Sequence, residues 1–469
     1  TNFKRYTEDG EKEVEEISED DNLFITGNNL LALHSLKKKY RGEVELIYLD
    51  PPYYFSSDKK SDTFSYNTNF KLSTWLSFMK NRLEIAYELL SEDGAIFVQI
   101  NNQAVAELEI LMKEIFNERD KDNLISLISV ETKAPSGFKM VNPGVFDTAE
   151  YILSFAKNKA EWEYNPQYVE ADYDKNYNKI VVNRDTHHSM WQIKSLRDYV
   201  AKEELEYSSQ REARKDLGKD GFDYQVAEFA KENADRVFRH AAISDSGAGK
   251  ETVETKKESQ NDEKVHIVER EEHDDRYIHK GSEIVFYENK VREIDGEKVP
   301  TKPLTDIWTD IPWEGIANEG GVTLKKGKKP EKLLERIIDM STEEGDLVLD
   351  FFLGSGTTAA VAHKMNRQYI GIEQLDYSDT DPTVRLDNVI NGDSTGISDA
   401  VSWEGGGDFV YAELMELNSK FLEEIESADS QEEVKKIWEE MKDQAFLSYK
   451  VDIGDVDESS SEFESLDLE

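Results

Sequence analysis

The sequence predicts an α/β protein whose parallel sheet is built from two separate stretches of the chain, with a long insertion between them. The first observation is an apolar run at 44–49, which has the length of a buried strand and leads into the tetrapeptide 50–53. The second is a strand, glycine-rich turn, helix and strand at 347–373, which form half of a nucleotide-binding fold. The third is the intervening region, 161–305, whose mixed composition gives no clear fold signal. In open sheets of this kind, ligands bind beyond the carboxyl ends of the strands.

The tetrapeptide Asp50-Pro51-Pro52-Tyr53 forms a short, stiff loop with hydrogen-bond acceptors and a stacking face. Its prolines fix φ and remove two N–H donors, so nearby backbone carbonyls are left to accept. The Asp50 carboxylate and the Pro51 carbonyl can accept the two hydrogens of a planar amine, while Tyr53 stacks on the ring that carries it. Taken alone, the tetrapeptide is also consistent with a structural turn after a strand.

A glycine-rich turn follows the second predicted strand, which ends at Asp350. Its glycines allow close approach of the backbone to a ligand, and the helix expected at 359–364 offers free N–H groups to a carboxylate. The next strand ends in Glu373, where an acid can bind both hydroxyls of a ribose. The turn residues assigned to ligand binding are Phe352, Gly354, Ser355, Gly356 and Thr357.

Together, the two motifs resemble those of the DNA aminomethyltransferases. Asp-Pro-Pro-Tyr is the catalytic motif of that family, and 350–358 is similar to its S-adenosylmethionine motif, with Phe351 where proline is common. The catalytic motif comes first, which is the permuted order of the β class. The resemblance implies a circularly permuted, Rossmann-like α/β methyltransferase with an inserted target-recognition domain and S-adenosylmethionine as cofactor. It also implies that Tyr53 stacks on a base flipped out of the duplex, and that Asp350 lies near the methionine amino group.

Further segments are similar to the Mod (methylation) subunits of type III restriction-modification systems. They lie at 27–36, 136–139, 150–153, 327–331, 396–398 and 403–411. Within the first of them, Asn28 is assigned to the cofactor. The resemblance implies methylation of adenine N6 in double-stranded DNA, a homodimer, and a Res nuclease-motor subunit as partner. Both ends of the chain look short for that family.

Two alternatives stay open. The same site could methylate cytosine N4, although Asp50, in place of the Ser common in cytosine enzymes, favours adenine. The chain could instead be a non-catalytic specificity protein that mimics DNA through its acidity. The intact motifs at both halves argue against that second alternative.

Composition narrows the function classes. The 469 residues include no cysteine, which excludes a thiol nucleophile, and with it cytosine-C5 methylation, and also thiolate zinc sites. The eight histidines show no ligand spacing, and no metal is expected. The sequence contains no apolar run of ~18 residues, so no membrane span is predicted. The charged N-terminus does not have the pattern of a signal peptide. These observations predict a cytoplasmic protein.

The net charge of −42 conflicts with DNA binding, which depends on cations meeting phosphates. Either the basic residues concentrate on one face, or the protein works in a salty cytoplasm. The acidic stretch 8–21 is expected to be a solvated, irregular end. His187 and His188 are interpreted as surface or DNA-contact residues. The candidate DNA contacts are Lys325, Lys328, Arg236 and Arg239.

The predicted organisation has five parts. They are a catalytic half at 22–160, a target-recognition insert at 161–305, a cofactor-binding half at 306–400, a helical segment at 401–450, and an acidic, disordered tail at 451–469. Apolar spacing and turn signals predict helices at 75–90, 104–116, 332–340, 411–425 and 431–444, and a turn at 93–94 that leads into a strand at 95–100.

Overall fold

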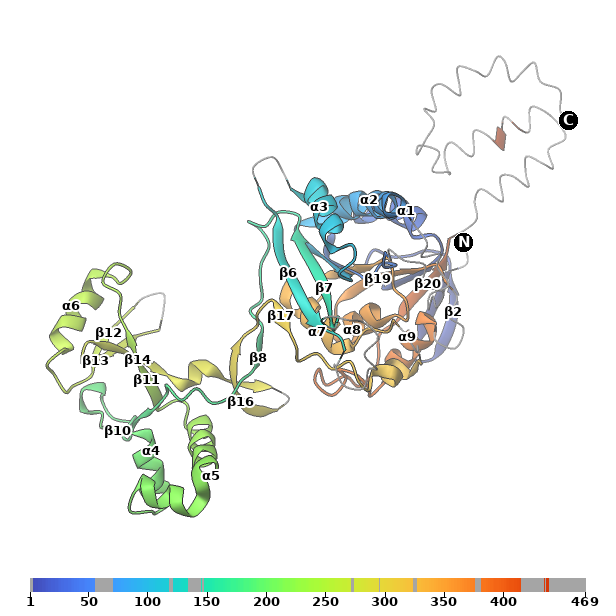
Figure 1. Cartoon of the computed structure of the whole chain (residues 1–469). Coiled ribbons are helices and arrows are strands. Elements are labelled where there is room, and N and C mark those ends of the chain that lie inside the picture. The colour runs from blue at the N-terminus through green and yellow to red at the C-terminus, as the bar shows by residue number, and fades with distance from the viewer. Residues whose placement is uncertain are drawn as a thin grey trace. The chain divides into compact units, whose positions relative to one another are not determined.

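The structure is a computed structural model, and it describes residues 3–54, 71–117, 121–133, 145, 147–270, 274–294, 296–323, 327–375 and 381–414, together with 434, 436 and 437. The chain divides into two compact units (Figure 1). Unit 1 comprises Thr1–Asn165 and Thr305–Glu469, and unit 2 is Pro166–Leu304. The limits of unit 2 lie within a few residues of the insert expected at 161–305.

Unit 1 is built on an eleven-stranded sheet with the order β17-β6-β7-β5-β4-β18-β19-β3-β20-β1-β2. Its strands are β1 (Phe3–Thr7), β2 (Gly10–Val14), β3 (Leu23–Thr26), β4 (Val44–Leu49), β5 (Leu90–Ile100), β6 (Leu124–Glu131), β7 (Ala149–Ala156), β17 (Ile307–Trp308), β18 (Leu347–Asp350), β19 (Gln368–Glu373) and β20 (Phe409–Glu413). The five strands from β5 to β3 in this order run parallel, and β7 runs antiparallel to both β5 and β6.

Helices cover both faces of this sheet (Figure 1). One layer contains α1 (Asn29–Tyr40), α2 (Leu72–Leu89) and α3 (Val105–Phe116); the other contains α7 (Glu331–Ser341), α8 (Thr357–Lys364), α9 (Pro382–Ile390) and, beside α9, the short η4 (Ile316–Gly321). Strands buried on both faces read as continuous apolar runs, as β4 does. The helices expected at 75–90, 104–116 and 332–340 are confirmed to within three residues as α2, α3 and α7.

The strand order reverses between β4 and β18, which lie side by side and parallel. From β4 the chain crosses through α2 to β5 on one side, and from β18 it crosses through α8 to β19 on the other. Loops that follow the two central strands therefore part to opposite faces and leave a crevice at their carboxyl ends. The predicted α/β class is confirmed, with the strand before the Asp-Pro-Pro-Tyr loop preceding the strand before the glycine-rich loop.

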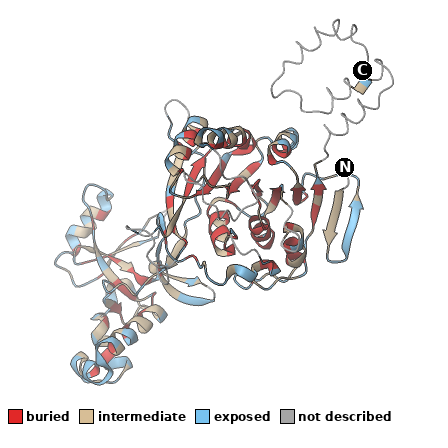
Figure 2. Ribbon diagram, turned by 45° about the vertical axis from the view of Figure 1, so that its right-hand side comes forward, coloured by how far each residue is buried: buried red, intermediate tan, exposed pale blue. Residues whose placement is uncertain are grey.

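Two expectations at the edge of the sheet are wrong. The acidic stretch 8–21 contains β2, which pairs with β1 as a hairpin, and this hairpin is largely intermediate or exposed (Figure 2). Charged side chains suit an edge strand because backbone hydrogen bonds, and not burial, hold it there. The helix expected at 411–425 does not begin at Tyr411, because β20 inserts between β3 and β1. The remainder of that helix, most of the one at 431–444, and the tail at 451–469 fall outside the described residues.

The turn expected at 93–94 is also wrong. Asp93 and Gly94 lie within β5, where the pairing with β4 shifts register between Val44 and Leu46. A Cβ on Gly94 would lie 2.7 Å from the Val44 carbonyl oxygen. The irregularity is therefore a bulge that needs a glycine, and the strand continues through it.

Unit 2 contains a six-stranded antiparallel sheet, β10-β9-β11-β14-β13-β12, and a three-stranded sheet, β15-β16-β8. These strands are β8 (Tyr168–Glu170), β9 (Lys179–Val181), β10 (Ile193–Ser195), β11 (Val237–Ala242), β12 (His266–Val268), β13 (Arg276–His279), β14 (Ser282–Phe286), β15 (Val291–Ile294) and β16 (Glu297–Pro303). The helices are η1 (His188–Met190), α4 (Leu196–Tyr199), η2 (Val200–Glu204), α5 (Gln210–Glu232), α6 (Lys250–Ser259) and η3 (Tyr287–Lys290). Phe222, Val226 and Ala230 of α5 form a core with Ile180 and Val237 of the larger sheet. The unit therefore has its own hydrophobic core.

Candidate active site

Two loops of unit 1 leave neighbouring parallel strands at the point where the strand order reverses. Asp50–Tyr53 follows β4, and the glycine-rich loop 351–356 follows β18. The sheet therefore brings together the two motifs that the sequence places far apart.

Asp50 forms an ion pair with Lys329, whose Nζ lies 2.7 Å from Asp50 Oδ2. The two side chains are only 18% and 11% exposed, so solvent screens the pair little. The other carboxylate oxygen of Asp50, Oδ1, is buried and has no hydrogen-bond partner among the described residues. Burial raises the pKa of Asp50, and the Lys329 ammonium opposes that rise. An acceptor is thus held ready in a largely dry site.

Lys329 is a site residue that the sequence analysis did not single out. Burial by itself would lower the pKa of Lys329, but the carboxylates of Asp50 and Glu150 raise it, so the side chain is an ammonium. Its Nζ also lies 5.6 Å from the centroid of the Tyr53 ring. The only sequence signal was its place in the 327–331 segment, just before the proline that caps α7.

Tyr53 is fixed by a chain of buried hydrogen bonds. Its hydroxyl donates to Glu150 Oε2 at 2.9 Å, and Gln99 Nε2 donates to the same oxygen at 2.6 Å. Tyr48 in turn donates to Gln99 Oε1 at 2.7 Å. Burial raises the pKa of Tyr53 well above its usual range, so its hydroxyl stays a donor. The ring orientation is therefore set by groups on β4, β5 and β7.

The backbone carbonyls of Pro51 and Pro52 differ in whether they accept a hydrogen bond within the protein. Trp75 of α2 donates its indole N–H to the Pro52 carbonyl at 2.8 Å. No described residue donates a hydrogen bond to the carbonyl of Pro51. Of the two carbonyls, that of Pro51 remains available to a ligand, and its assignment to an amine hydrogen stays a prediction.

For the methyl transfer that the sequence resemblance implies, we predict that Tyr53→Ala lowers the rate about 10- to 100-fold, because base stacking on an aromatic ring contributes roughly 1–3 kcal/mol. Tyr53→Phe keeps the ring and should retain most of the activity, although it loses the bond to Glu150. Initial rates of methyl incorporation into DNA would measure both variants. If Phe were as damaging as Ala, the hydroxyl and the Glu150 chain, and not the stacking face, would be what matters.

The glycine-rich loop is fastened at Asp350, the last residue of β18. The Asp350 carboxylate accepts from the Phe352 backbone N–H at 2.9 Å and from the Thr358 hydroxyl at 2.6 Å. Burial raises the pKa of Asp350 to about 7. Gly354 and Gly356 have φ of 57° and 82°, which favour glycine. The loop thus requires both glycines to turn into α8.

Glu373, at the end of β19, binds the same loop. Its Oε2 accepts from the Gly354 N–H at 2.8 Å, and its Oε1 accepts from the Gln374 and Leu375 N–H groups at 2.8 and 2.9 Å. The side chain is only 4% exposed. Glu373 therefore already orients the backbone of the loop, and its assignment to ribose hydroxyls stays a prediction.

The two asparagines at the start of α1 have different positions. Asn28 is exposed and caps the helix by accepting from the Leu30 N–H at 3.0 Å. Asn29 is buried and donates to the Phe351 carbonyl at 2.8 Å, while Arg82 donates to its Oδ1 at 2.8 Å. Asn29, which the sequence analysis did not assign, is thus the asparagine that holds the glycine-rich loop.

A buried ionic network supports the loop from α9. Arg385 donates to the Thr357 hydroxyl at 2.7 Å and lies 3.5 Å from the Ser355 hydroxyl. Its guanidinium pairs with Glu331 at 2.7 Å, and Glu331 also pairs with Lys364 at 2.9 Å. The side chains of Arg385, Glu331 and Lys364 are fully buried. Ser355 and Thr357, which the sequence analysis assigned to the cofactor, are therefore held in place by an ionic network. Its members are far apart in the sequence, so no local sequence pattern predicts it.

Lys328 is unsuited to the predicted DNA contact, and that assignment is wrong. Its side chain is 5% exposed, and its ammonium donates to the backbone carbonyls of Ala317, Glu319 and Val322. Burial lowers the pKa of Lys328 to about 8. Three carbonyls satisfy its three donors, so Lys328 ties the 317–322 segment to the start of α7. Lys325 lies outside the described residues.

Arg236 and Arg239 lie on and beside β11 in unit 2. Arg236 donates through Nε and Nη2 to Asn233 Oδ1, at 3.0 and 2.7 Å. Arg239 is placed over the Tyr177 ring, 5.6 Å from its centroid. Both are partly exposed, and their role in DNA binding stays a prediction.

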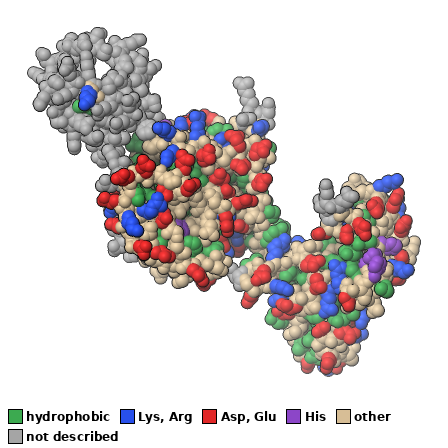
Figure 3. Space-filling view, turned by 180° about the vertical axis from the view of Figure 1, so that it is seen from behind, with side chains coloured by type: hydrophobic (Ala, Val, Ile, Leu, Met, Phe, Trp, Pro, Cys, Tyr) green, Lys and Arg blue, Asp and Glu red, His purple; other side chains and the backbone are tan. Residues whose placement is uncertain are grey.

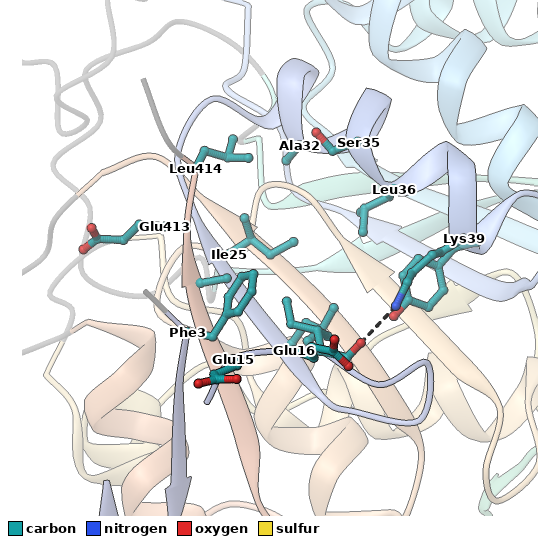
Figure 4. Close-up of a pocket in the computed structure, with 14 residues that line it drawn as sticks. Phe3, Glu15, Glu16, Ile25, Ala32, Ser35, Leu36, Lys39, Glu413 and Leu414 are labelled. Atoms are coloured by element: carbon teal, nitrogen blue, oxygen red, sulfur yellow. Dashed lines mark hydrogen bonds between the residues drawn. The ribbon is translucent and has the colours of Figure 1, made fainter. Parts of the chain in front are cut away.

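A groove of about 730 Å³ opens elsewhere in unit 1, between α1 and the strands β3, β20 and β1. Apolar side chains such as Ile25, Leu36 and Leu414 line it, with Glu15, Glu16 and Lys39 at its rim (Figure 4). It includes no residue of the Asp50–Tyr53 loop or of the glycine-rich loop. The groove is therefore separate from the candidate active site.

Over the described ranges, no group of three or more His, Asp or Glu side chains is placed to hold a metal ion. Nor does any helix within those same ranges have the length and apolar character needed to cross a membrane.

The fold and the site define a Rossmann-like α/β protein in which an acidic Pro-Pro-Tyr loop and a glycine-rich loop follow two neighbouring parallel strands. The family model described as DNA methylase (N6_N4_Mtase) matches residues 44–246 and 227–378. The chain belongs to the DNA methylase family.

The chain is similar to the Mod subunits of several type III restriction-modification enzymes. It is 37% identical to the "Probable type III restriction-modification enzyme HindVI Mod subunit" of Haemophilus influenzae, over all of this chain and 65% of that protein. It is 26% identical to the EcoPI Mod subunit of Escherichia phage P1, over 88% of this chain and 63% of the relative. For the EcoP15I Mod subunit of Escherichia coli the identity is 24%, over 76% and 58%. The chain thus spans about three fifths of the length of these relatives.

Proposed function

We propose that the chain is an S-adenosylmethionine-dependent DNA methyltransferase that modifies adenine N6, as the modification and specificity subunit of a type III restriction-modification system. The observation that carries the proposal is the meeting of the Asp50–Tyr53 loop and the glycine-rich loop 351–356 at the reversal of strand order. Similarity to Mod subunits supports the choice of system.

The residues of the glycine-rich loop fit S-adenosylmethionine. Asp350 and Glu373 would supply buried carboxylates for its methionine ammonium group and its ribose, and two glycines let the backbone approach. When bound, this cofactor supplies an electrophilic methyl group on a sulfonium. No metal ion or covalent enzyme intermediate is required, because the site acts by positioning the two reactants. Phe352 lies on this loop, and Asn28 caps α1 beside Asn29, which donates to the Phe351 carbonyl; these two residues complete the set assigned to the cofactor.

The tetrapeptide loop would hold the target base. A flipped adenine stacks on Tyr53, and its amine donates one hydrogen to Asp50 and the other to the Pro51 carbonyl. Asp50 Oδ2 is engaged by Lys329, so the amine takes the unpartnered Oδ1. Asp50 and the Pro51 carbonyl would hold the amine nitrogen in line with the methyl group that the bound cofactor would supply. The amine then loses one proton, to Asp50 or to water.

The partners are part of the proposal. They are double-stranded DNA with the target base flipped out, a second copy of this chain, and a Res nuclease-motor subunit. Unit 2 would be the target-recognition insert, since it folds around its own core. Its 24 Lys and Arg against 31 Asp and Glu give it a small share of the net charge of −42. The strong acidity of the chain therefore belongs mainly to the parts outside the insert.

A single incubation tests the proposal. The purified chain is mixed with unmethylated genomic DNA and S-adenosylmethionine, and the DNA is digested to nucleosides for mass spectrometry. We expect N6-methyladenine. N4-methylcytosine would support the cytosine alternative. If no modified base forms and calorimetry detects no cofactor binding, the non-catalytic DNA-mimic alternative replaces this proposal.

We predict that cofactor affinity rises as pH rises from 5.5 to 7. Asp350 has a pKa of about 7, far above the ordinary 3.8, so it is largely protonated at the lower pH. A cationic ligand prefers the carboxylate, so loss of that proton promotes binding, with a limit of about tenfold per pH unit. Calorimetric titrations at fixed ionic strength would measure this dependence. Asp350→Asn should bind weakly and without the pH dependence; a flat wild-type profile would contradict the prediction.

A further inference from the structure

The loop that joins β9 to β10 in unit 2, residues 182–192, carries an arginine stacked among three aromatic rings. The Arg184 guanidinium carbon lies 3.8 Å from the centroid of Phe286, 4.4 Å from that of Trp191 and 5.4 Å from that of Tyr277. Phe286 is buried in a small core on this side of the sheet, and Trp191 and Tyr277 pack at its border. The rings hold the guanidinium flat without offering it an acceptor.

Arg184 has no hydrogen bond or ion pair with any described residue, although it carries five N–H donors. The Glu288 carboxylate is near enough for Arg184 to lower its pKa, against the rise that burial causes, but no ion pair joins the two. Arg292 in the same unit is different. It lies 3.3 Å from the Tyr168 ring centroid and donates to the Thr301 hydroxyl at 2.8 Å. The N–H edge of Arg184 thus has no acceptor among the described residues.

Hydrogen bonds within the 182–192 loop fix its backbone on both sides of Arg184. Asn183 Nδ2 donates to the Met190 carbonyl at 3.0 Å, and Asn183 Oδ1 accepts from the Gln192 N–H at 2.7 Å. The Trp191 indole donates to the Thr186 carbonyl at 2.9 Å. These bonds tie the two ends and the middle of the loop together. A preorganised loop loses little entropy when a partner binds.

The tip of this loop is exposed. Met190 is 62% exposed, and His187 is exposed beside His188, with their ring centroids 4.1 Å apart. Histidine side chains gather on one side of unit 2, close to Lys and Arg side chains (Figure 3). The loop therefore presents a fixed cation together with stacking and hydrogen-bonding groups.

We propose that the 182–192 loop is a DNA-contacting element of unit 2, in which Arg184 donates two N–H groups to a pair of acceptors on the duplex. This inference rests on the proposed function. A planar guanidinium held by stacking matches a bidentate acceptor, and DNA offers two: phosphate oxygens, and the O6 and N7 of guanine in the major groove. Phosphate contacts position the protein, whereas guanine contacts specify sequence.

The test uses the full chain with Arg184→Ala and Arg184→Lys, and with Arg292→Ala as the matched control. Binding to fluorescently labelled, unmethylated genomic fragments is measured, and modified positions are mapped after methylation. We expect Arg184→Ala to weaken DNA binding about 10- to 100-fold, with S-adenosylmethionine affinity and thermal unfolding close to wild type. Arg184→Lys should recover only part of the loss, because lysine keeps the charge but not the fork. Arg292→Ala should bind DNA as wild type does.

The outcomes separate the two acceptors and the two proposals. A sequence preference relaxed at one position indicates a guanine edge; a uniform loss with a salt slope reduced by about 0.9 indicates a phosphate. Wild-type binding by Arg184→Ala overturns the inference, as does an equal loss in Arg292→Ala. If wild type binds DNA but modifies no base, the proposed function fails, while the binding comparison still decides the role of Arg184.

Discussion

Asp50→Ala should lower methyl transfer by at least two to three orders of magnitude, while cofactor affinity stays within a few-fold of wild type. Removal of one preorganised polar group from a reacting centre has an effect of about that size. Asp50 is the one carboxylate of the tetrapeptide 50–53, and in the proposed mechanism it shares the two amine hydrogens with the Pro51 carbonyl. The cofactor should be affected little, because Asp350 and Glu373 hold the glycine-rich loop through their own hydrogen bonds.

The ion pair with Lys329 adds a second expected consequence of this substitution. Without Asp50, the Lys329 ammonium would be buried beside fewer negative charges, and breaking such a pair costs about 3–5 kcal/mol when it is well buried. Asp50→Ala should therefore also lower the free energy of unfolding. The double variant Asp50→Ala, Lys329→Met should regain much of the lost stability, because the uncompensated charge is removed. It should regain none of the activity.

Methyl incorporation, calorimetry with S-adenosylmethionine, and urea denaturation would together measure this set of variants. Lys329→Met alone is informative as well. It leaves the Asp50 carboxylate buried without its partner, so the pKa of Asp50 should rise further and the acid limb of the pH–rate profile should move to higher pH. Activity near wild type in Asp50→Ala would remove Asp50 from the mechanism, and unchanged stability would show that Lys329 finds another countercharge.

The two loops could be predicted from sequence because each depends on contiguous residues. A buried strand followed by Asp50-Pro51-Pro52-Tyr53 fixes both the position and the type of the loop. The same is true of the strand that ends in Asp350 and the glycines that follow. Rules for parallel sheets then place both loops at carboxyl ends. What they leave open is the set of side chains that reach the loops from elsewhere.

Lys328 and Lys329 show why the side chains that contact the loops from elsewhere in the chain could not be predicted from sequence. Both belong to one basic run, and charge alone suggested that Lys328 contacts phosphates. Only the tertiary structure shows that Lys328 is covered by three backbone carbonyls while its neighbour reaches Asp50. Side chains that alternate along an extended segment point to different surroundings. The sequence carries no local signal for which of the two reaches the reactive carboxylate.

Two strands near one end of the sheet, β2 and β20, were missed for different reasons. β2 has charged residues at most positions, and its place in the sheet depends on backbone pairing with β1. β20 begins after three glycines and joins strands from the opposite end of the chain, β3 and β1. Hydrophobic periodicity reports burial, so it does not detect an exposed edge strand such as β2. β20 is buried, but its partners are distant in the sequence, so no local pattern shows that it is a strand.

The buried network beneath the glycine-rich loop gives the second large prediction. Glu331→Ala should lower the free energy of unfolding by about 3–5 kcal/mol, because it leaves Arg385 and Lys364 buried without their shared carboxylate. Lys364 keeps a second partner in Asp393, at 2.6 Å, so most of the cost falls on Arg385. Arg385 in turn positions Thr357 and Ser355, so cofactor affinity should fall as well.

Helix α7 offers a matched control for this substitution. Glu335 pairs with Lys332 at 2.8 Å on the same helix, but Lys332 is 40% exposed and solvent screens the pair. Glu335→Ala should change stability by no more than about 0.5 kcal/mol. Urea denaturation and calorimetry with S-adenosylmethionine would compare the two variants. If Glu331→Ala and Glu335→Ala lower the free energy of unfolding equally, the buried network has no special role in stability. If Glu331→Ala loses stability but keeps full cofactor affinity, the network stabilises the fold without holding the loop.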